Sequence, residues 1–278
     1  MTIDDKTTLA CFLDLTEDYL RDGHKRNAQI NPAAMPAEIN TVHEKLSSLP
    51  LAYQIDENEA AESYTEESVE PPSSVEHSPP LYDSLDDSLM VISSDITVCQ
   101  TCGLAATRTL VVPGEGVERP LVMVIGEGPG ADEDKAGRPF VGRAGQLLDK
   151  MLESIGLSRN KNCFIANMIK CRPPGNRDPG PDEIAACYPY LERQITLLRP
   201  RIILCAGRVA AQNLLKTGTG INALRGKFTK LRIGENDIPV LCTFHPSAIL
   251  RDESLKRPAW EDLKLLKSHL GNTGNGDN

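Results

Sequence analysis

Four short apolar runs, separated by stretches with helical periodicity, constrain the fold of this chain more than any other feature of its sequence. The runs are LVMVIG, CFIANM, RIILCAG and PVLCTF, at residues 121–126, 163–168, 201–207 and 239–244. The helical patterns between and after them cover residues 142–155, 181–198, 208–216 and 258–270. Continuous apolar runs are typical of parallel strands that are buried on both faces. We therefore predict an α/β fold: a three-layer α/β/α sandwich around a central, mainly parallel, four-stranded sheet.

The charge is distributed unevenly along the 278 residues and suggests how the chain is divided. The overall net charge of −9 argues against a nucleic-acid partner, but residues 53–95 alone carry −12, whereas residues 96–278 carry +6. Residues 53–95 are also rich in Ser and Pro and poor in apolar surface, so we predict a disordered linker there. We expect residues 96–272 to form the folded domain and residues 273–278 to be a disordered tail.

Residues 1–52 form an N-terminal extension for which we predict one short amphipathic helix. Its apolar positions are Leu9, Phe12, Leu13, Leu15 and Leu20, and it ends near Gly23. Such a helix can dock a partner or pack on its own domain, and the pattern favours neither. The chain shows no secretory signal and no run approaching the roughly 18 apolar residues of a membrane span. We therefore expect a cytoplasmic protein, in a reducing compartment, without membrane contact.

Two loops at the ends of predicted strands carry residues suited to chemistry, because sites in this fold class lie at the carboxyl ends of the strands. The first loop, GEGPGADED, combines closely spaced glycines with carboxylates, among them Glu127 and Glu133. It matches neither a Walker loop nor G-x-G-x-x-G, and glycine content alone is equally compatible with a structural turn. In the second loop, Asn167 can pair bidentately with a pyrimidine edge, although Asn also commonly caps a turn.

His245 follows the last apolar run and opens a helical turn whose first residue is Pro246. A His in this position can stabilise a developing anion, although a lone His is more often a structural residue.

In a reducing compartment we do not expect the eight cysteines to form a disulfide framework, and their uneven spacing indicates a metal or cluster site together with some buried thiols. Four of them, Cys99, Cys102, Cys171 and Cys187, begin with a C-x2-C pair and can converge tetrahedrally on a metal site. Zinc and a [4Fe-4S] cluster both accept four Cys ligands, and the spacing does not choose between them. Cys163, Cys205 and Cys242 lie in strand-like runs, where we expect them to be buried apolar residues.

Taken together, these motifs resemble the family 4 uracil-DNA glycosylases, the iron-sulfur branch of the uracil-DNA glycosylase superfamily. The resemblance covers about residues 96–270. It rests on GEGPGADEDKAGRPFVGRAGQLLDKML, NMIKCRPPGNRDPGPDEIAAC, HPSAILR and the four cysteines, all in the order of the family. Several long motifs in register are far more specific than any one of them.

The resemblance implies a monofunctional DNA repair hydrolase that flips uracil out of the stack, releases it and leaves an abasic site. Phe140 would stack on uracil, Asn167 would pair with its polar edge, and Gly128 would line the pocket. His245 would donate a hydrogen bond to O2 of uracil as the base departs as an anion. Ser247 would touch a DNA phosphate, and Leu250 and Arg251 would enter the gap left by the flipped base.

The water-activating group stays open in this reading, because Gly128 stands where family 1 enzymes have an Asp. Glu127 and Glu133 are the candidates for this group. The alternative is that the protein only positions the water and does not deprotonate it. Glu133 is also the expected barrier to the methyl group of thymine.

Of zinc and a [4Fe-4S] cluster, the resemblance implies the cluster. The four cysteines would hold it, in a structural or DNA-positioning role. The expected partner is uracil-containing DNA, single- or double-stranded, bound by a monomer. The N-terminal extension can hold a protein partner or compete with DNA through its acidity. A binding module without catalysis is the competing hypothesis, and we disfavour it because Phe140, Asn167 and His245 are all present.

Overall fold

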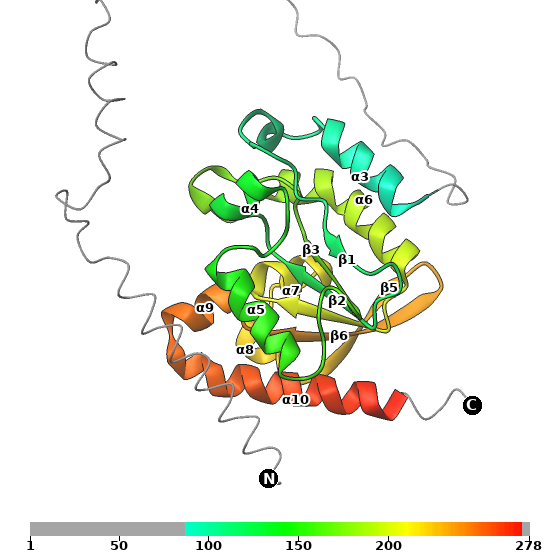
Figure 1. The fold of residues 1–278 in the computed structure, drawn as a ribbon, viewed down its shortest axis with the longest axis vertical. Helices are drawn as coiled ribbons and strands as arrows, with labels where there is room; N and C mark the ends of the chain where they lie inside the picture. The colour runs from blue at the N-terminus through cyan, green and yellow to red at the C-terminus, as the bar shows by residue number, and fades with distance from the viewer. Residues whose placement is uncertain (1–86, 274–278) are drawn as a thin grey trace, which may run out of the picture. The chain divides into compact units, whose positions relative to one another are not determined.

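The computed structural model describes residues 87–273, which are built around one six-stranded sheet. The strand order is β1-β3-β2-β4-β6-β5 (Figure 1). The four central strands run parallel to one another and are β2 (Val122–Gly126), β3 (Cys163–Asn167), β4 (Ile202–Ala206) and β6 (Asn236–Thr243). Each of them overlaps one of the predicted apolar runs, although β6 begins three residues earlier than its run, so the α/β class and the parallel centre of the sheet are confirmed.

The prediction of four strands is wrong, because an antiparallel strand borders the sheet on each side. β1 (Glu115–Gly116) pairs with β3, and β5 (Phe228–Ile233) forms a hairpin with β6. β1 is too short to give a sequence pattern. β5 alternates exposed charged residues with buried Leu231 and Ile233, as an edge strand with one solvated face does, so it lacks the continuous apolar run used for the prediction.

Helices cover both faces of the sheet and complete the three layers (Figure 1). α5 (Arg143–Glu153), α9 (Pro246–Arg251) and α10 (Lys256–Thr273) share one apolar core, whereas α6 (Pro181–Leu198) and α7 (Arg208–Leu214) share the other. Successive residues of β2 point alternately into the two cores: Val122 and Val124 into the first, Met123 and Ile125 into the second. No helix within residues 87–273 is long and apolar enough to cross a membrane.

The folded part of the chain begins before residue 96, where the composition placed its boundary. α3 (Leu89–Val98) packs against α6 and buries Ile92 and Ile96. Arg193 of α6 donates hydrogen bonds to Asp87 at 2.9 Å and to Asp95 at 2.8 Å. Two of the acids assigned to the linker are therefore ion-paired with a residue about a hundred positions further along, which composition cannot reveal. The predicted N-terminal helix, the linker up to residue 86 and residues 274–278 lie outside the described residues.

The connections of β2 create the crevice in which a site is expected. β2 lies between β3 and β4, so the chain leaves it toward one side of the sheet and later returns on the other. Ligands of open α/β sheets bind at such a switch point, outside the carboxyl ends of the strands. The short helices α4 (Ala131–Ala136) and α8 (Ile221–Leu224) lie in the connections after β2 and α7.

Candidate functional site

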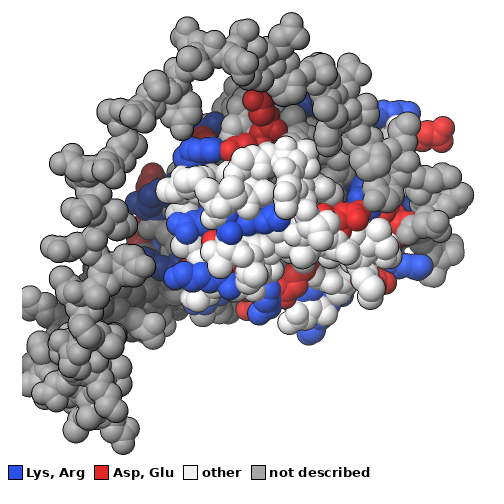
Figure 2. All heavy atoms as spheres, turned by 90° about the horizontal axis from the view of Figure 1, so that it is seen from above, with Lys and Arg blue, Asp and Glu red and all other residues white. Residues whose placement is uncertain are grey.

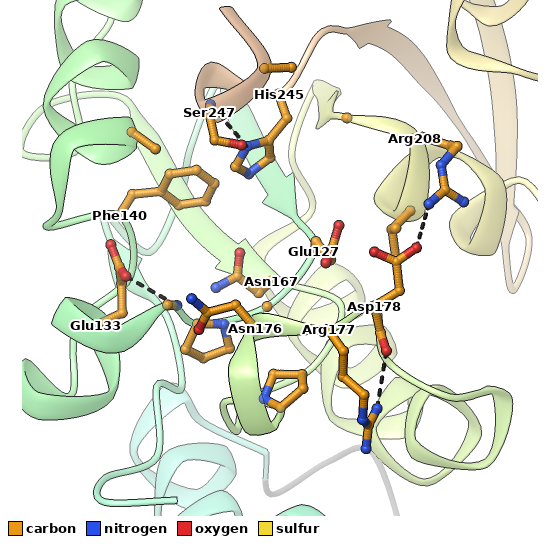
Figure 3. Close-up of a pocket in the computed structure, with 18 of the residues that line it drawn as sticks. Glu127, Glu133, Phe140, Asn167, Asn176, Arg177, Asp178, Arg208, His245 and Ser247 are labelled. Atoms are coloured by element: carbon orange, nitrogen blue, oxygen red, sulfur yellow. Dashed lines mark hydrogen bonds and ion pairs between the residues drawn. The ribbon is translucent and has the colours of Figure 1, made fainter. Parts of the chain in front are cut away.

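The loops that follow β2, β3, β4 and β6 meet at the carboxyl end of the sheet and enclose a cavity of about 500 Å3 (Figure 3). Eight of the nine residues predicted for catalysis, base binding and DNA contact line it: Glu127, Gly128, Glu133, Phe140, Asn167, His245, Ser247 and Arg251. Leu250 is the exception. It is partly buried and packs against the core.

Asn167 is the last residue of β3 and lies at the bottom of the cavity. It stands in register with Gly126 of β2, and a Cβ atom at that glycine would lie only 2.5 Å from both Asn167 Oδ1 and the Phe140 ring. Within residues 87–273, Asn167 Oδ1 is the only fully buried side-chain oxygen or nitrogen without a hydrogen-bond partner. An unpaired buried carbonyl is costly and is rare in folded proteins. This oxygen is therefore placed to receive a donor from a ligand.

Phe140 forms one wall of the cavity (Figure 3). Its backbone has a φ of +52°, in the left-handed region that bulky residues rarely adopt. Its ring centroid lies 5.6 Å from that of His245, with 32° between the planes. A strained backbone persists only where its surroundings hold it, and such residues cluster at binding sites. The face of the ring that lines the cavity is suited to stacking on a flat ligand.

His245 caps the N-terminus of α9, and this contact fixes which ring nitrogen carries the proton. The backbone N–H of Ser247 donates to His245 Nδ1 at 3.1 Å, and the Ser247 hydroxyl lies 2.8 Å from the same atom. Since Nδ1 accepts, the proton of the neutral ring is on Nε2. Burial, together with the nearby positive charge of Arg251, lowers the pKa of His245 to about 4. The ring is therefore a neutral hydrogen-bond donor at physiological pH.

The two predicted acids have different surroundings. Glu133 accepts hydrogen bonds from the backbone N–H groups of Val141 and Gly142, both at 2.9 Å, and of Gly130 at 3.1 Å. Its carboxylate thus holds the loop that carries Phe140. Glu127 points into the cavity (Figure 3). Burial, with repulsion from Asp178, raises the pKa of Glu127, while Arg208 and Arg251 act in the opposite direction.

Two arginines at the mouth of the cavity are absent from the sequence-based set. Arg208 forms an ion pair with Asp178. Arg177 forms an ion pair with Glu183 at 2.6 Å and donates to the backbone oxygen of Asp178 at 3.0 Å. Both guanidinium groups are about half exposed. Arg208 is the first residue of α7 and is separated from β4 by Gly207 alone, so the strand-end rule applied to the third apolar run would have identified it. On the face seen in Figure 2, Lys and Arg side chains lie in rows beside uncharged surface.

The four cysteines predicted as ligands line a second, small cavity between the start of the domain, the loop after β3 and α6. The backbone N–H of Lys170 donates to Cys187 Sγ at 3.3 Å, and Arg108 Nη1 donates to Cys171 Sγ at 3.3 Å. No three His, Cys, Asp or Glu side chains of residues 87–273 are grouped closely enough to hold a metal ion as they are placed. The four thiols nevertheless line one cavity, and in number and chemistry they match the ligands of an iron-sulfur cluster.

Comparison with known proteins agrees with this geometry. The family model of the uracil DNA glycosylase superfamily matches residues 113–264. The type-4 uracil-DNA glycosylase of Sulfurisphaera tokodaii is 45% identical over 65% of this chain and 84% of its own length. Those of Archaeoglobus fulgidus and Saccharolobus solfataricus are 43% and 44% identical, over 68% and 66% of this chain and 94% and 87% of their own lengths. The chain therefore belongs to the uracil-DNA glycosylase superfamily.

Proposed function

We propose that this protein hydrolyses the N-glycosidic bond of deoxyuridine in DNA, releasing uracil and leaving an abasic site. The observation that carries the proposal is the unpaired, buried Oδ1 of Asn167 in a cavity walled by Phe140 and His245. Each feature suits one part of a flipped uracil: an amide for its polar edge, an aromatic face for its ring, and a neutral N–H donor for a carbonyl oxygen.

Base recognition follows from the donor and acceptor pattern of uracil. Uracil presents N3–H and the carbonyl oxygen O4 side by side, and the amide of Asn167 offers an acceptor and a donor in the same order. Cytosine presents an acceptor at N3 and a donor at N4, so the same amide would have to turn over to pair with it. A buried site that pairs with polar groups rejects a base with the wrong pattern strongly, because its own groups are then left unpaired.

Bond cleavage leaves positive charge on the sugar and negative charge on uracil, and the site carries a group that stabilises each of these charges. His245 Nε2–H donates to O2 of uracil, where negative charge grows toward the transition state. Because the ring is neutral, its Nε2–H is only weakly acidic, so His245 donates this hydrogen bond without transferring its proton. Glu127 places a carboxylate near the sugar and the attacking water, where it stabilises the cation and orients the water. Glu133 is a positioning residue, since both of its oxygens accept backbone N–H groups.

Contact with DNA is made around the mouth of the cavity. The N-glycosidic bond of a uracil stacked in a duplex is shielded from the active site, so the nucleotide must leave the stack, at a cost of a few kcal/mol. Arg251, Arg177 and Arg208 surround the opening and can neutralise phosphates on either side of the flipped nucleotide. We expect the protein to act as a monomer in the reducing cytoplasm, where cysteine thiols persist.

The proposal is tested by base release from matched oligonucleotides that carry U opposite G, U opposite A, U in a single strand, or T opposite G. We expect alkali-labile strands from the three uracil substrates and none from T opposite G. Binding of the uracil oligonucleotides without any base release, by protein with a full complement of iron, would replace the enzyme by a DNA-binding module.

The pH dependence of turnover reports on Glu127. Its pKa is raised above the ordinary value of 4.5, so as the pH falls from neutrality the carboxylate is protonated and loses its charge. We expect the single-turnover rate of the wild type to fall on the acidic side, and Glu127→Gln to be about 10- to 100-fold slower at neutral pH with this decline removed. His245, with a pKa of about 4, titrates at lower pH. An unchanged acidic decline in the variant would assign it to another group.

We further propose that Cys99, Cys102, Cys171 and Cys187 hold a [4Fe-4S] cluster. The cluster would supply a rigid cross-link between segments that are far apart in sequence. The chain itself contributes the N–H groups of Lys170 and Arg108 to two of the sulfurs. The loop that follows Asn167, the last residue of β3, leads to Cys171, so a cluster that holds Cys171 in place would also hold this side of the base pocket.

Replacement of one of the four cysteines tests directly whether they hold iron. Protein purified without oxygen is expected to contain about four iron atoms per chain and a broad visible absorption. Cys171→Ser should lose most of both and unfold at lower temperature. The matched control is Cys163→Ser, which changes a buried thiol outside this cavity and should retain the iron. Stoichiometric zinc in place of iron would overturn the assignment.

A further inference from the structure

We propose that Arg159 is a positioning residue for base stacking: it holds the strained loop of Phe140 in the shape that turns the ring toward the flipped base. The inference rests on the proposed function, since it assigns Arg159 a part in the same reaction. Arg159 lies outside the base-binding cavity, in the connection between α5 and β3, and none of the predicted roles includes it.

The contacts of Arg159 converge on the backbone at Phe140. Nη1 donates to the carbonyl of Pro139 and Nη2 to that of Phe140, both at 2.9 Å. The side chain is only 9% exposed. The planar guanidinium group presents its donors in a fixed fork, so one side chain can fix two successive carbonyls in a defined orientation. A buried arginine with both carbonyls in reach therefore sets the direction of the peptide groups on both sides of Phe140.

Arg159 is itself anchored on α5. Its Nε and Nη2 donate to Asp149 Oδ1 at 3.1 and 2.8 Å, and Glu115 lies 3.5 Å from Nη1. The carboxylates balance the buried charge and fix the side chain. The helix, the arginine and the loop thus form one connected unit.

Glu133 completes the clamp from the opposite direction. It accepts the N–H groups of Val141 and Gly142, while Arg159 donates to the carbonyls of Pro139 and Phe140. Four successive residues, 139–142, are therefore each fixed at one backbone group by a charged side chain. This accounts for how Phe140 keeps a positive φ, which an unsupported Phe would abandon.

The loop also has room to move if the clamp is removed. A cavity of about 390 Å3, distinct from the base-binding cavity and from the cysteine-lined one, is lined by residues that include Phe140, Val141, Asp149 and Arg159. Phe140 thus separates two hollows, and Arg159 belongs to the one behind it. Without the guanidinium group, the loop can relax into that space and carry the ring away from the base. Misplacement of a binding group by about 1 Å costs on the order of 100-fold in rate.

The experiment is a double-mutant cycle between Arg159→Ala and Phe140→Ala, measured as single-turnover uracil release with the full-length protein. We expect Arg159→Ala to lower the rate about 100-fold in the wild-type background and less than about 3-fold in the Phe140→Ala background, because the ring through which it acts is then absent. Arg138→Ala is the matched control: it removes an exposed arginine of the same loop that pairs with Glu115, and should change the rate less than about 3-fold.

The Arg159→Lys variant tests the same proposal if Arg159→Ala does not fold. Lys keeps the positive charge beside Asp149 but lacks the fork, so we expect a wild-type unfolding midpoint and a rate lowered about 10-fold, again only when Phe140 is present. Equal losses in both backgrounds, or losses no larger than that of Arg138→Ala, would overturn the proposal. So would a Phe140→Ala variant as fast as the wild type. Failure of the proposed function is a separate result: the wild-type chain would release no uracil.

Discussion

Replacement of His245 by Ala is expected to slow uracil release by about 10²- to 10⁴-fold while changing the affinity for uracil-containing DNA less than about 3-fold. The imidazole Nε2–H is directed at charge that exists only as the bond breaks, and removal of one such donor typically costs this much in rate. In the ground state, O2 of uracil is an ordinary carbonyl oxygen and gains little from the same hydrogen bond. The loss therefore falls on the chemical step.

Single-turnover kinetics and a binding titration on the same oligonucleotide separate these two effects. His269→Ala is the matched control, because His269 stacks on Phe228, a residue outside the cavity lining, and its loss should leave the rate unchanged. The neutral state of His245 gives a second check: the wild-type rate should not fall as the pH rises through 6.5, where an ordinary imidazolium loses its proton. Equal losses in binding and rate would contradict the assigned role.

The sequence predicts the centre of the fold well because burial on both faces leaves a strong signal. β2, β3, β4 and β6 must be apolar throughout, whatever their neighbours are. The edge strands and α3 follow different requirements. β5 needs only one apolar face, and α3 is fixed by Ile92, Ile96 and the pairing of Arg193 with two acids distant in sequence. Interactions of that kind leave no local pattern.

The same distinction applies to the site. The strand-end rule and the family motifs predict that Glu127, Asn167 and His245 belong to one site, and the structure places all three in one cavity. The prediction is possible because the topology of the sheet determines where the loops meet. The division of labour between the acids depends on hydrogen bonds that only the structure supplies. Glu133 carries the same side chain as Glu127 and lies six residues away, yet its carboxylate binds three backbone N–H groups, whereas Glu127 accepts none of them. Arg159 acts through backbone carbonyls and matches no motif of side chains.

Replacement of Asn167 by Leu is expected to remove activity without loss of stability, which separates recognition from folding at a single buried position. In the free protein, Asn167 Oδ1 is buried without a partner, so an apolar side chain of similar shape removes an unfavourable group. We expect the free energy of unfolding to stay constant or rise by about 0.5–1 kcal/mol. In the complex, N3–H and O4 of uracil are then left unpaired, at about 1–3 kcal/mol each. The rate should fall on the order of 10²- to 10⁴-fold.

Denaturant unfolding and single-turnover uracil release, measured on the same preparations, test both halves of this expectation. Asn213→Leu provides the comparison, because Asn213 lies on α7 and donates to the carbonyl of Val209 at 2.8 Å, so its replacement should lower stability and leave the rate unchanged. A loss of stability in Asn167→Leu as large as in the comparison variant would mean that the amide is a structural group. A gain in stability with a loss of rate would show that the fold maintains an unsatisfied polar atom for the base that it binds.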